Sequence, residues 1–407
     1  MGAADFRIVS ISALERFLIA FLAICNGCWV LCKHFFKKLW DPNSTIPVPR
    51  DKPPTCLVDS TLGQHQYVKL QGIKYHYVEA GQENHPTILL LHGFPDCWLG
   101  WRYQIPVLST HFRVIALDLK GFGDTEKPIW RRSYKIKTIL KELKQFIKLL
   151  GVNECILIGH DLGALLGWYL VHDSPELILK FVSVSCPHPN VYWKTLKNEN
   201  VFNTSWMHFV QLPYLPEIDA MWDDLKLLSK AHKHLKHKTE EEYLQAYKYS
   251  FSRNEDWVGP MNYYRNLPYV RVCETSEQIR VSTLIIQGDQ NSGFLLQGFV
   301  RSTEYCENSN LRIIEAAGHF PHQENPDQFN KEVLKFLRIG RVIKSEDSPT
   351  KSIMGRMFGA GSTIVKYGNS VLVNVQNKTK TGVINNIPNM GVGLIKEAHF
   401  VNENVKI

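Results

Sequence analysis

The stretch ILIGHDLGALLGW, residues 156–168, puts a carboxylate at the centre of a tight turn between two apolar runs. Gly159 and Gly163 flank Asp161 at the spacing of a nucleophile elbow, in which a strand turns sharply into a helix and holds the middle side chain strained above a sheet. A carboxylate there can attack carbon and form an ester unaided, and water then needs a base to cleave that ester. A helix-capping aspartate is the alternative interpretation.

An oxyanion hole and a base are encoded at suitable places. HGFP, residues 92–95, directly follows an apolar run and precedes Trp98. The amides of Phe94 and Leu162 are therefore predicted to face a developing oxyanion. His319, in AAGHFPHQENP, follows a late apolar run and is predicted to deprotonate water, with His322 as its competitor.

A proton donor is expected from GPMNYYRN, residues 259–266. A phenol aimed at the nucleophile could protonate an oxygen leaving group. Taken alone, a tyrosine in a segment this rich in aromatic residues more often packs in a core.

The elements that must position these groups alternate along the chain. HQYVKLQGIKYHYVEAG, with Gly72, predicts a hairpin, and helical patterns such as YKIKTILKELKQFIKLLG, which ends at Gly151, follow it. Between the helices lie short apolar runs suited to buried parallel strands. The alternation predicts an α/β fold with a mostly parallel sheet and helices on both faces. The apolar runs are TILLLHG, RVIALDLKG, CILIGHD, KFVSVSC, STLIIQGD and LRIIEAAGH.

About a hundred residues between VSVSC and STLIIQG have helical and aromatic character without a good strand. Because the chain returns to the sheet afterwards, an inserted helical cap is favoured over a second independent domain. The predicted parts are a hydrophobic anchor (1–40), a linker (41–60), the core (61–187 and 279–340), the cap (188–278) and a weakly ordered tail (341–407).

HGFP, GHDxG, GPxNxYRN and the late Gly-His together make the chain resemble an epoxide hydrolase of the α/β-hydrolase family, most closely the membrane-anchored animal branch. The resemblance covers about residues 60–340. It implies that Asp161 opens the epoxide and forms a hydroxyalkyl ester, that Tyr264 is one of two tyrosines polarising the ring oxygen, and that His319 with an acid activates water. Phe94 and Leu162 would supply the oxyanion hole.

Two positions depart from the family pattern. The family's acid aligns onto Asn291, in GDQN, where an amide can orient the imidazole of His319 but cannot stabilise its charge. Asp289 could substitute if the loop bends. The first cap tyrosine aligns onto Trp206, whose indole donates a hydrogen bond but does not protonate an alkoxide; a shifted register is the alternative, although Tyr214 lies too late.

These departures predict an epoxide hydrolase that accumulates its ester. The substrate is expected to be a small apolar, lipid-like epoxide, with water as the second reactant, bound by Trp206 and Trp98 beneath the cap. No metal or organic cofactor is implied. Two rivals stay open. The first is a haloalkane-type dehalogenase, disfavoured by Leu162 where such enzymes carry tryptophan. The second is a catalytically impaired homologue that binds a lipid.

The composition excludes other classes. The net charge of +8 is spread out, without basic blocks interleaved with aromatic residues, so nucleic acid is not an expected partner. The nine cysteines have neither metal-site nor disulfide-framework spacing, which favours reduced thiols.

The N-terminus suits a membrane. FLIAFLAICNGCWVLC, residues 17–32, is strongly apolar and is followed by KHFFKKLW. Because no small-residue cleavage site follows, an uncleaved single-pass anchor is favoured over a signal peptide. Lysines after the run outnumber the arginines before it, which predicts a catalytic domain on the cytoplasmic side, with the endoplasmic reticulum as the expected membrane.

Overall fold

The computed structural model describes residues 8–41, 49–236, 240–273, 277–291, 293–337, 363–367 and 370–376. The strands are β1 (Ile8–Ser10), β2 (Gln64–Leu70), β3 (Ile73–Ala80), β4 (Thr87–Leu91), β5 (Arg113–Leu117), β6 (Cys155–His160), β7 (Ile178–Val184), β8 (Val270–Val272), β9 (Ser282–Gly288), β10 (Asn308–Ile314), β11 (Thr363–Tyr367) and β12 (Ser370–Gln376). The α-helices are α1 (Ala13–Trp40), α2 (Thr55–Val58), α3 (Ile105–Leu108), α4 (Ile136–Leu149), α5 (Leu162–Asp173), α6 (Pro189–Thr195), α7 (Thr204–Phe209), α8 (Leu215–Ala231), α9 (Glu241–Ser250), α10 (Glu255–Tyr264), α11 (Leu296–Ser302), α12 (Pro321–Glu324) and α13 (Pro326–Leu337).

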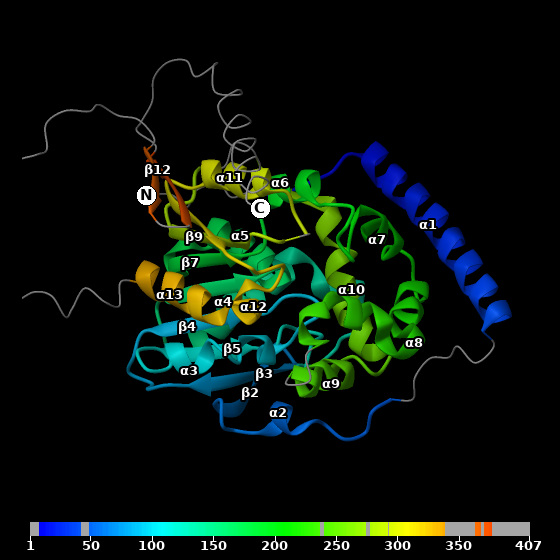
Figure 1. Ribbon diagram of the computed structural model, residues 1–407, viewed down its shortest axis with the longest axis horizontal. Helices are drawn as coiled ribbons and strands as arrows, with labels where there is room; N and C mark the ends of the chain where they lie inside the picture. The colour runs from blue at the N-terminus through cyan, green and yellow to red at the C-terminus, as the bar shows by residue number, and fades with distance from the viewer. Residues whose placement is uncertain are drawn as a thin grey trace, which may run out of the picture. The chain divides into compact units, whose positions relative to one another are not determined.

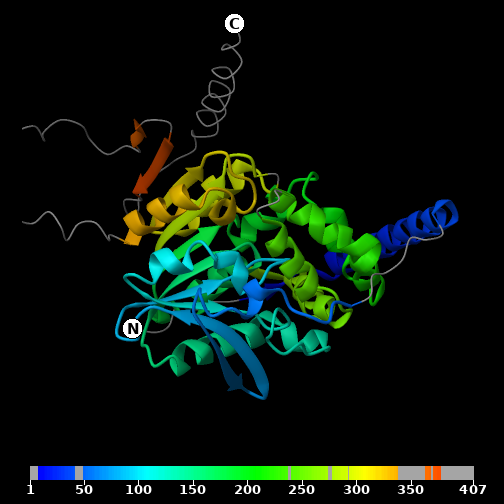
Figure 2. The same ribbon diagram turned by 60° about the horizontal axis from the view of Figure 1, so that its bottom comes forward.

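A single mostly parallel sheet forms the core of the fold. Its strands lie in the order β11-β12-β10-β9-β7-β6-β4-β5-β3-β2. The six strands from β10 to β5 in this order pair in parallel, whereas β3 pairs antiparallel with both β5 and β2. Figure 2 shows the predicted hairpin of β2 and β3, in blue, at the sheet edge, with Gly72 in its turn at a φ of +88°. The predicted α/β fold is confirmed.

The central strands are apolar along their whole length because both faces of the sheet are covered. Every residue of β4, β5 and β6 is buried. Helix α5 packs on β6 and β7 and is itself buried from Leu162 to Val171, so it carries no polar face. Helix α4 is amphipathic, since its buried residues recur three or four apart, and its C-terminal end leads into Gly151 at a φ of +76°.

The insertion between β7 and β9 is mostly helical. Helices α6 to α10 lie within it, and Figure 1 shows α7, α8, α9 and α10, in green, gathered beside the sheet. One difference from the sequence expectation is the short strand β8, which pairs antiparallel with β1. Its partner comes from the N-terminus, so local patterning gave no sign of the pair.

Helix α1 contains the predicted apolar segment and is longer than it. It is the one helix in the described ranges that is long and apolar enough to cross a membrane by length and composition. Within the predicted tail, the structure describes β11 and β12, which pair antiparallel; the remainder of residues 341–407 lies outside the described ranges.

Candidate active site

Asp161 lies at a strained turn between β6 and α5. Its backbone has a φ of 45° and a ψ of −112°, which side chains other than glycine rarely adopt. Glycine is required two residues later, at position 163, because a Cβ there would lie 2.2 Å from the carbonyl oxygen of Leu91 on β4. The turn thus has the geometry of a nucleophile elbow, with the carboxylate at its apex.

Three predicted site residues contact the carboxylate of Asp161. The backbone N–H of Phe94 donates to Oδ2 at 3.1 Å. The hydroxyl of Tyr264, from α10 of the cap, donates to the same oxygen at 3.4 Å. The Nε2 atom of His319 lies 3.5 Å from Oδ1. The structure therefore brings the predicted nucleophile, proton donor and base together. Leu162 follows as the first residue of α5, and the role of its amide stays a prediction.

The environment keeps the carboxylate ionised and the phenol protonated. Burial raises the pKa of Asp161, but the hydrogen bond and charge of His319, together with His160 and the Phe94 amide, outweigh it, so the pKa lies below its ordinary value. Burial, reinforced by the charge of Asp161, holds the pKa of Tyr264 well above its ordinary value. At neutral pH the pair is an anion facing a proton donor.

The HGFP loop is fixed where it presents its amide to Asp161. Glycine is needed at position 93, because a Cβ there would lie 2.6 Å from Nδ1 of His160 and 2.8 Å from Cβ of Asp161. The imidazole of His92 donates from Nδ1 to the carbonyl of Gly93 and accepts at Nε2 from the N–H of Leu119. The loop after β4 is thereby tied to the segment after β5.

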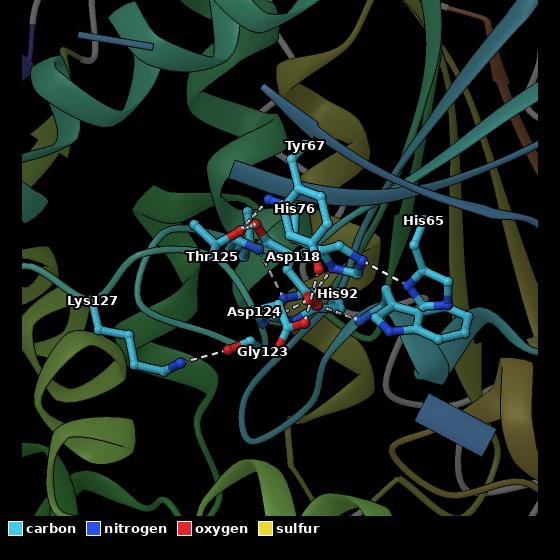
Figure 3. A network of polar contacts seen from close by, with 11 residues as sticks. His65, Tyr67, His76, His92, Asp118, Gly123, Asp124, Thr125 and Lys127 are labelled. Atoms are coloured by element: carbon cyan, nitrogen blue, oxygen red, sulfur yellow. Dashed lines mark hydrogen bonds and ion pairs between the residues drawn. The ribbon is translucent and has the colours of Figure 1, made fainter. Parts of the chain in front are cut away.

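A buried network supports the same loop from the sheet edge (Figure 3). Asp118 accepts from the N–H of Trp98 at 2.8 Å and lies 2.7 Å from Nδ1 of His76, whose Nε2 lies 2.8 Å from Nδ1 of His65. Burial raises the pKa of Asp118, but the hydrogen bond and charge of His76 bring it below its ordinary value. These contacts join β2, β3 and the loop that carries Phe94.

The side chain of Trp98 contacts the supporting network around Asp118. Its ring packs edge-on against His65, and it lines a cavity of about 120 Å³ together with Asp118 and Lys127. Asp161 is not among the residues that line this cavity. These contacts place Trp98 in the supporting network, and its role in substrate binding stays a prediction.

His319 is held by its backbone, through contacts that the sequence analysis did not identify. Glu324 accepts from the N–H groups of Gly318 and Phe320 at 2.9 and 3.0 Å. His160 donates from Nε2 to the carbonyl of His319 at 2.9 Å, and burial lowers its pKa to about 3, which keeps it neutral. His160 adjoins the nucleophile in sequence and could have been singled out, whereas nothing in the sequence marks Glu324.

The other ring nitrogen of His319 faces the predicted acid position. Nδ1 of His319 and Nδ2 of Asn291 are both buried and have no hydrogen-bond partner among the described residues. Oδ1 of Asn291 instead accepts from the N–H of Gly293 at 2.7 Å. Asp289 is exposed and accepts from the N–H of Ala317. Neither candidate therefore gives His319 a charged partner here.

Aromatic side chains from the cap cover the carboxylate. The ring centroid of Trp206, on α7, lies 5.7 Å from that of Phe94 and 5.3 Å from that of Tyr264. Phe202 packs against both Phe94 and Trp206, at 4.8 Å from each. Trp206 is thus placed beside the donor tyrosine, and the surface above Asp161 is largely apolar.

The GPMNYYRN motif fixes Tyr264 in the cap. Arg265 forms a buried ion pair with Glu217 at 2.7 Å. Gln211 donates to the carbonyl of Tyr264 at 2.9 Å. Glycine at position 259 allows close backbone contact with Gly121 of the core, since a Cβ there would lie 2.6 Å from the Cα of Gly121. The motif therefore joins cap to core around the phenol.

His322 belongs to a second buried cluster. Asp96, His160 and His322 bring possible metal-ligand atoms within 4.8 Å of one another. The amide of Gln323 donates to Asp96 and lies 3.4 Å from Nε2 of His322. Burial raises the pKa of Asp96 to about 7 and lowers that of His322 well below its ordinary value. Hydrogen bonds engage Asp96 and the Nε2 atoms of both histidines, whereas Nδ1 of His160 and Nδ1 of His322 have no hydrogen-bond partner among the described residues. A reaction without metal stays a prediction.

Comparison with known proteins places the fold and site in a family. Residues 86–326 match the family model described as alpha/beta hydrolase fold. Human Epoxide hydrolase 4 is 35% identical over 325 residues, which cover 75% of this chain and 89% of the relative. Epoxide hydrolase 3 of Xenopus tropicalis is 32% identical, with coverage of 71% and 82%. The structure of Bacillus megaterium epoxide hydrolase in complex with an inhibitor aligns with a TM-score of 0.59 at 28% identity, covering 67% of this chain and 99% of that one. The chain therefore belongs to the epoxide hydrolases of the α/β-hydrolase fold family.

Proposed function

We propose that this hydrolase acts on apolar, lipid-like epoxides through a covalent ester on Asp161. The observation that carries the proposal is the convergence of His319, Tyr264 and the Phe94 amide on one buried carboxylate. The aromatic cover of Phe94 and Trp206 supports an apolar substrate.

In the first step, a carboxylate oxygen of Asp161 attacks an epoxide carbon and the carbon–oxygen bond of the ring breaks. Tyr264 donates its proton to the departing oxygen, which its raised pKa keeps available. The products are a hydroxyalkyl ester on Asp161 and a phenolate, which regains its proton from solvent. Trp206 offers only a hydrogen-bond donor where the family has a second phenol, so ring opening is expected to be slowed.

In the second step, His319 takes a proton from water, which attacks the ester carbonyl. The Phe94 amide stabilises the oxyanion, whose collapse breaks the ester bond. The released alkoxide takes the proton of the Asp161 carboxyl and leaves as the diol, and His319 passes its proton to solvent, which restores the enzyme. During this step the imidazole gains a positive charge that Asn291 cannot neutralise. Ester cleavage is therefore proposed to limit turnover. A second candidate function, a homologue that binds lipid without turnover, is favoured only by the unpartnered Nδ1 atom of His319.

The test is the mass of the intact chain after mixing with a fatty-acid epoxide. The expected result is a stoichiometric adduct that maps to Asp161 and decays with the appearance of diol; Asp161→Asn, a close match in shape, forms none. Fast multiple turnover without an adduct overturns slow ester cleavage. Halide release from a haloalkane in place of diol formation identifies a dehalogenase. Binding without adduct or diol identifies the lipid-binding homologue.

Attachment to a membrane through α1 is also part of the proposal. Its length and apolar composition support it. The endoplasmic reticulum, with the catalytic domain on the cytoplasmic side, is the proposed location, since lysines cluster after the apolar run. Glycosidase-sensitive mobility of the full-length chain on a gel contradicts this orientation.

A further inference from the structure

Helix α1 packs along its length against the cap. Its less exposed positions recur mostly every three or four residues, and all the remaining residues of the helix are exposed. At about 1.5 Å per residue this stripe runs roughly 27 Å, close to the thickness of a bilayer core of about 30 Å. The stripe includes Ile19, Ala23, Gly27, Val30, His34 and Lys37.

The docked stripe is small and partly polar, and its partners are identifiable. A Cβ on Gly27 would lie 2.3 Å from Cδ1 of Leu212, so helix and cap touch closely there. His34 lies 2.6 Å from Oδ1 of Asp219, and Lys37 forms an ion pair with Asp223. These acidic partners belong to α8, so the cap surface beneath α1 carries charged side chains and is unsuited to contact with lipid hydrocarbon.

The N-terminal end of α1 is tied down as well. Strand β1, directly before the helix, pairs with β8 of the insertion. The guanidinium of Arg16 lies 5.9 Å above the ring of Tyr269, and the N–H of Ile11 donates to the carbonyl of Tyr269. Both ends of α1 therefore contact the body of the protein. Figures 1 and 2 both show the helix, in blue, alongside the green cap helices.

The face turned away from the cap carries the large apolar side chains. Phe17 is 66% exposed, Trp29 72% and Trp40 89%. Between Phe17 and Cys32, the exposed positions are all apolar or cysteine. A protein partner would normally be met by hydrogen-bonding groups, about one per 100–200 Å² of interface. Along that length the side chains of this face offer only the indole N–H of Trp29 and the weak thiol donors of the cysteines, whereas the hydrocarbon of a lipid leaflet requires no hydrogen-bonding groups.

We propose that α1 lies in the plane of one membrane leaflet, docked on the cap, rather than crossing the bilayer. A crossing helix would draw the charged residues of α8 into hydrocarbon or abandon the contacts of His34 and Lys37. An in-plane helix keeps them and immerses only the outer face. This replaces the single crossing expected from hydropathy alone. The proposed cytoplasmic location then rests on attraction of the lysines after the apolar run to the anionic cytoplasmic leaflet.

The arrangement also relates the membrane to the active site, a link that rests on the proposed function. Helix α1 packs on α7, and α7 carries Trp206 above the nucleophile. An apolar substrate dissolved in the leaflet would therefore lie one helix away from the aromatic cover of Asp161.

The depth of the outer face in lipid tests the proposal. Full-length protein is bound to vesicles of phosphatidylcholine with a minority of phosphatidylserine and labelled with a fluorophore at one cysteine at a time: Leu18→Cys, native Cys25 or Phe36→Cys, which share one side of α1. Quenching by lipids brominated at different chain positions reports depth. A label at Glu154→Cys, on the exposed surface of the core, serves as control. The other accessible cysteines, Cys28, Cys32, Cys56 and Cys273, are replaced by serine, and so is Cys25 in every variant that is labelled elsewhere.

We expect equal, shallow depths at the three α1 positions and no quenching at the control. A deep Cys25 between a shallow Leu18→Cys and a shallow Phe36→Cys shows a crossing helix and overturns the proposal. No quenching at any α1 position also overturns it.

Oxidative cross-linking of Gly27→Cys with Leu212→Cys supplies a second measurement. The bond should form in vesicles as readily as in detergent, and its loss in vesicles alone shows that α1 leaves the cap. Neither readout requires turnover, so an inactive enzyme does not affect them, and diol formation in detergent tests the proposed function separately.

Discussion

Asn291→Asp places a negative charge at the one position where the proposed mechanism lacks it. Oδ1 of Asn291 and Nδ1 of His319 lie 2.9 and 3.1 Å from the same point, the Cβ position that Gly293 leaves empty. The two atoms are therefore roughly 6 Å apart or less. A carboxylate and an imidazolium at roughly 4–6 Å gain about 3–4 kcal/mol at an effective dielectric constant of about 20.

That energy applies only once the imidazole has taken its proton, so it lowers the barrier to ester cleavage. It corresponds to an acceleration of about 10²- to 10³-fold. Burying the new carboxylate reduces the gain, since Asn291 is only 3% exposed. Formation of the ester by Asp161 is expected to change little, because His319 takes up no proton in that step.

The assay follows the intact mass after a single addition of epoxide to excess enzyme. In the parent the adduct forms and decays slowly; in Asn291→Asp it should form at the same rate and decay about 10²-fold faster. Asn291→Leu, of similar size and without charge, is the matched control and should not accelerate decay. Equal decay in the parent and the aspartate variant refutes the assignment of position 291. Slower decay in Asp289→Asn than in the parent would show that Asp289 serves as the acid.

Three further outcomes are expected. Trp206→Tyr restores a second phenol beside Tyr264 and should speed ester formation about 10²-fold in single-turnover mass measurements, without altering ester decay. Gly163→Ala places a Cβ 2.2 Å from a backbone oxygen and should lower the free energy of unfolding by about 3 kcal/mol, whereas Gly151→Ala, with open space around it, should cost about 1 kcal/mol in the same denaturant titration. Because the pKa of Asp96 is raised to about 7, the native state keeps a proton that the unfolded state loses, and stability falls as the pH rises from about 4 to about 7. Asp96→Asn should remove this loss of unfolding free energy, which amounts to up to about 4 kcal/mol. Melting temperatures measured across that pH range should then vary less than those of the parent, and an unchanged pH profile contradicts a protonated Asp96.

Local sequence patterns predicted the sheet because each central strand is buried on both faces and reads as an apolar run. The nucleophile turn could also be predicted from the sequence, since only glycine fits the close backbone contact at position 163. The same holds for His319 and the HGFP loop, whose motifs mark the ends of strands. These features depend on residues that are close together in the chain, so local sequence patterns are enough to predict them.

Contacts between segments that are distant in the chain could not be predicted from the sequence. The pairing of β1 with β8 joins residues more than 250 positions apart, and no periodicity announces it. Trp98 is a related case, because its place beside HGFP predicted a substrate contact but gave no sign of its contact with His65 at the sheet edge. Its role in substrate binding stays a prediction. The docking of α1 was hidden too, since a lipid-facing helix and a cap-docked helix share one overall hydropathy.

The N–H groups of Gly318 and Phe320, which flank His319, donate hydrogen bonds to Glu324. The position of the base therefore depends on different contacts from those that set its strength. The imidazole is carried by a loop that is anchored through its main chain, so a change of side chain at position 291 does not require the loop to rearrange. Descendants of such a protein are thus able to change reaction speed over orders of magnitude by single substitutions at one position while the scaffold stays intact.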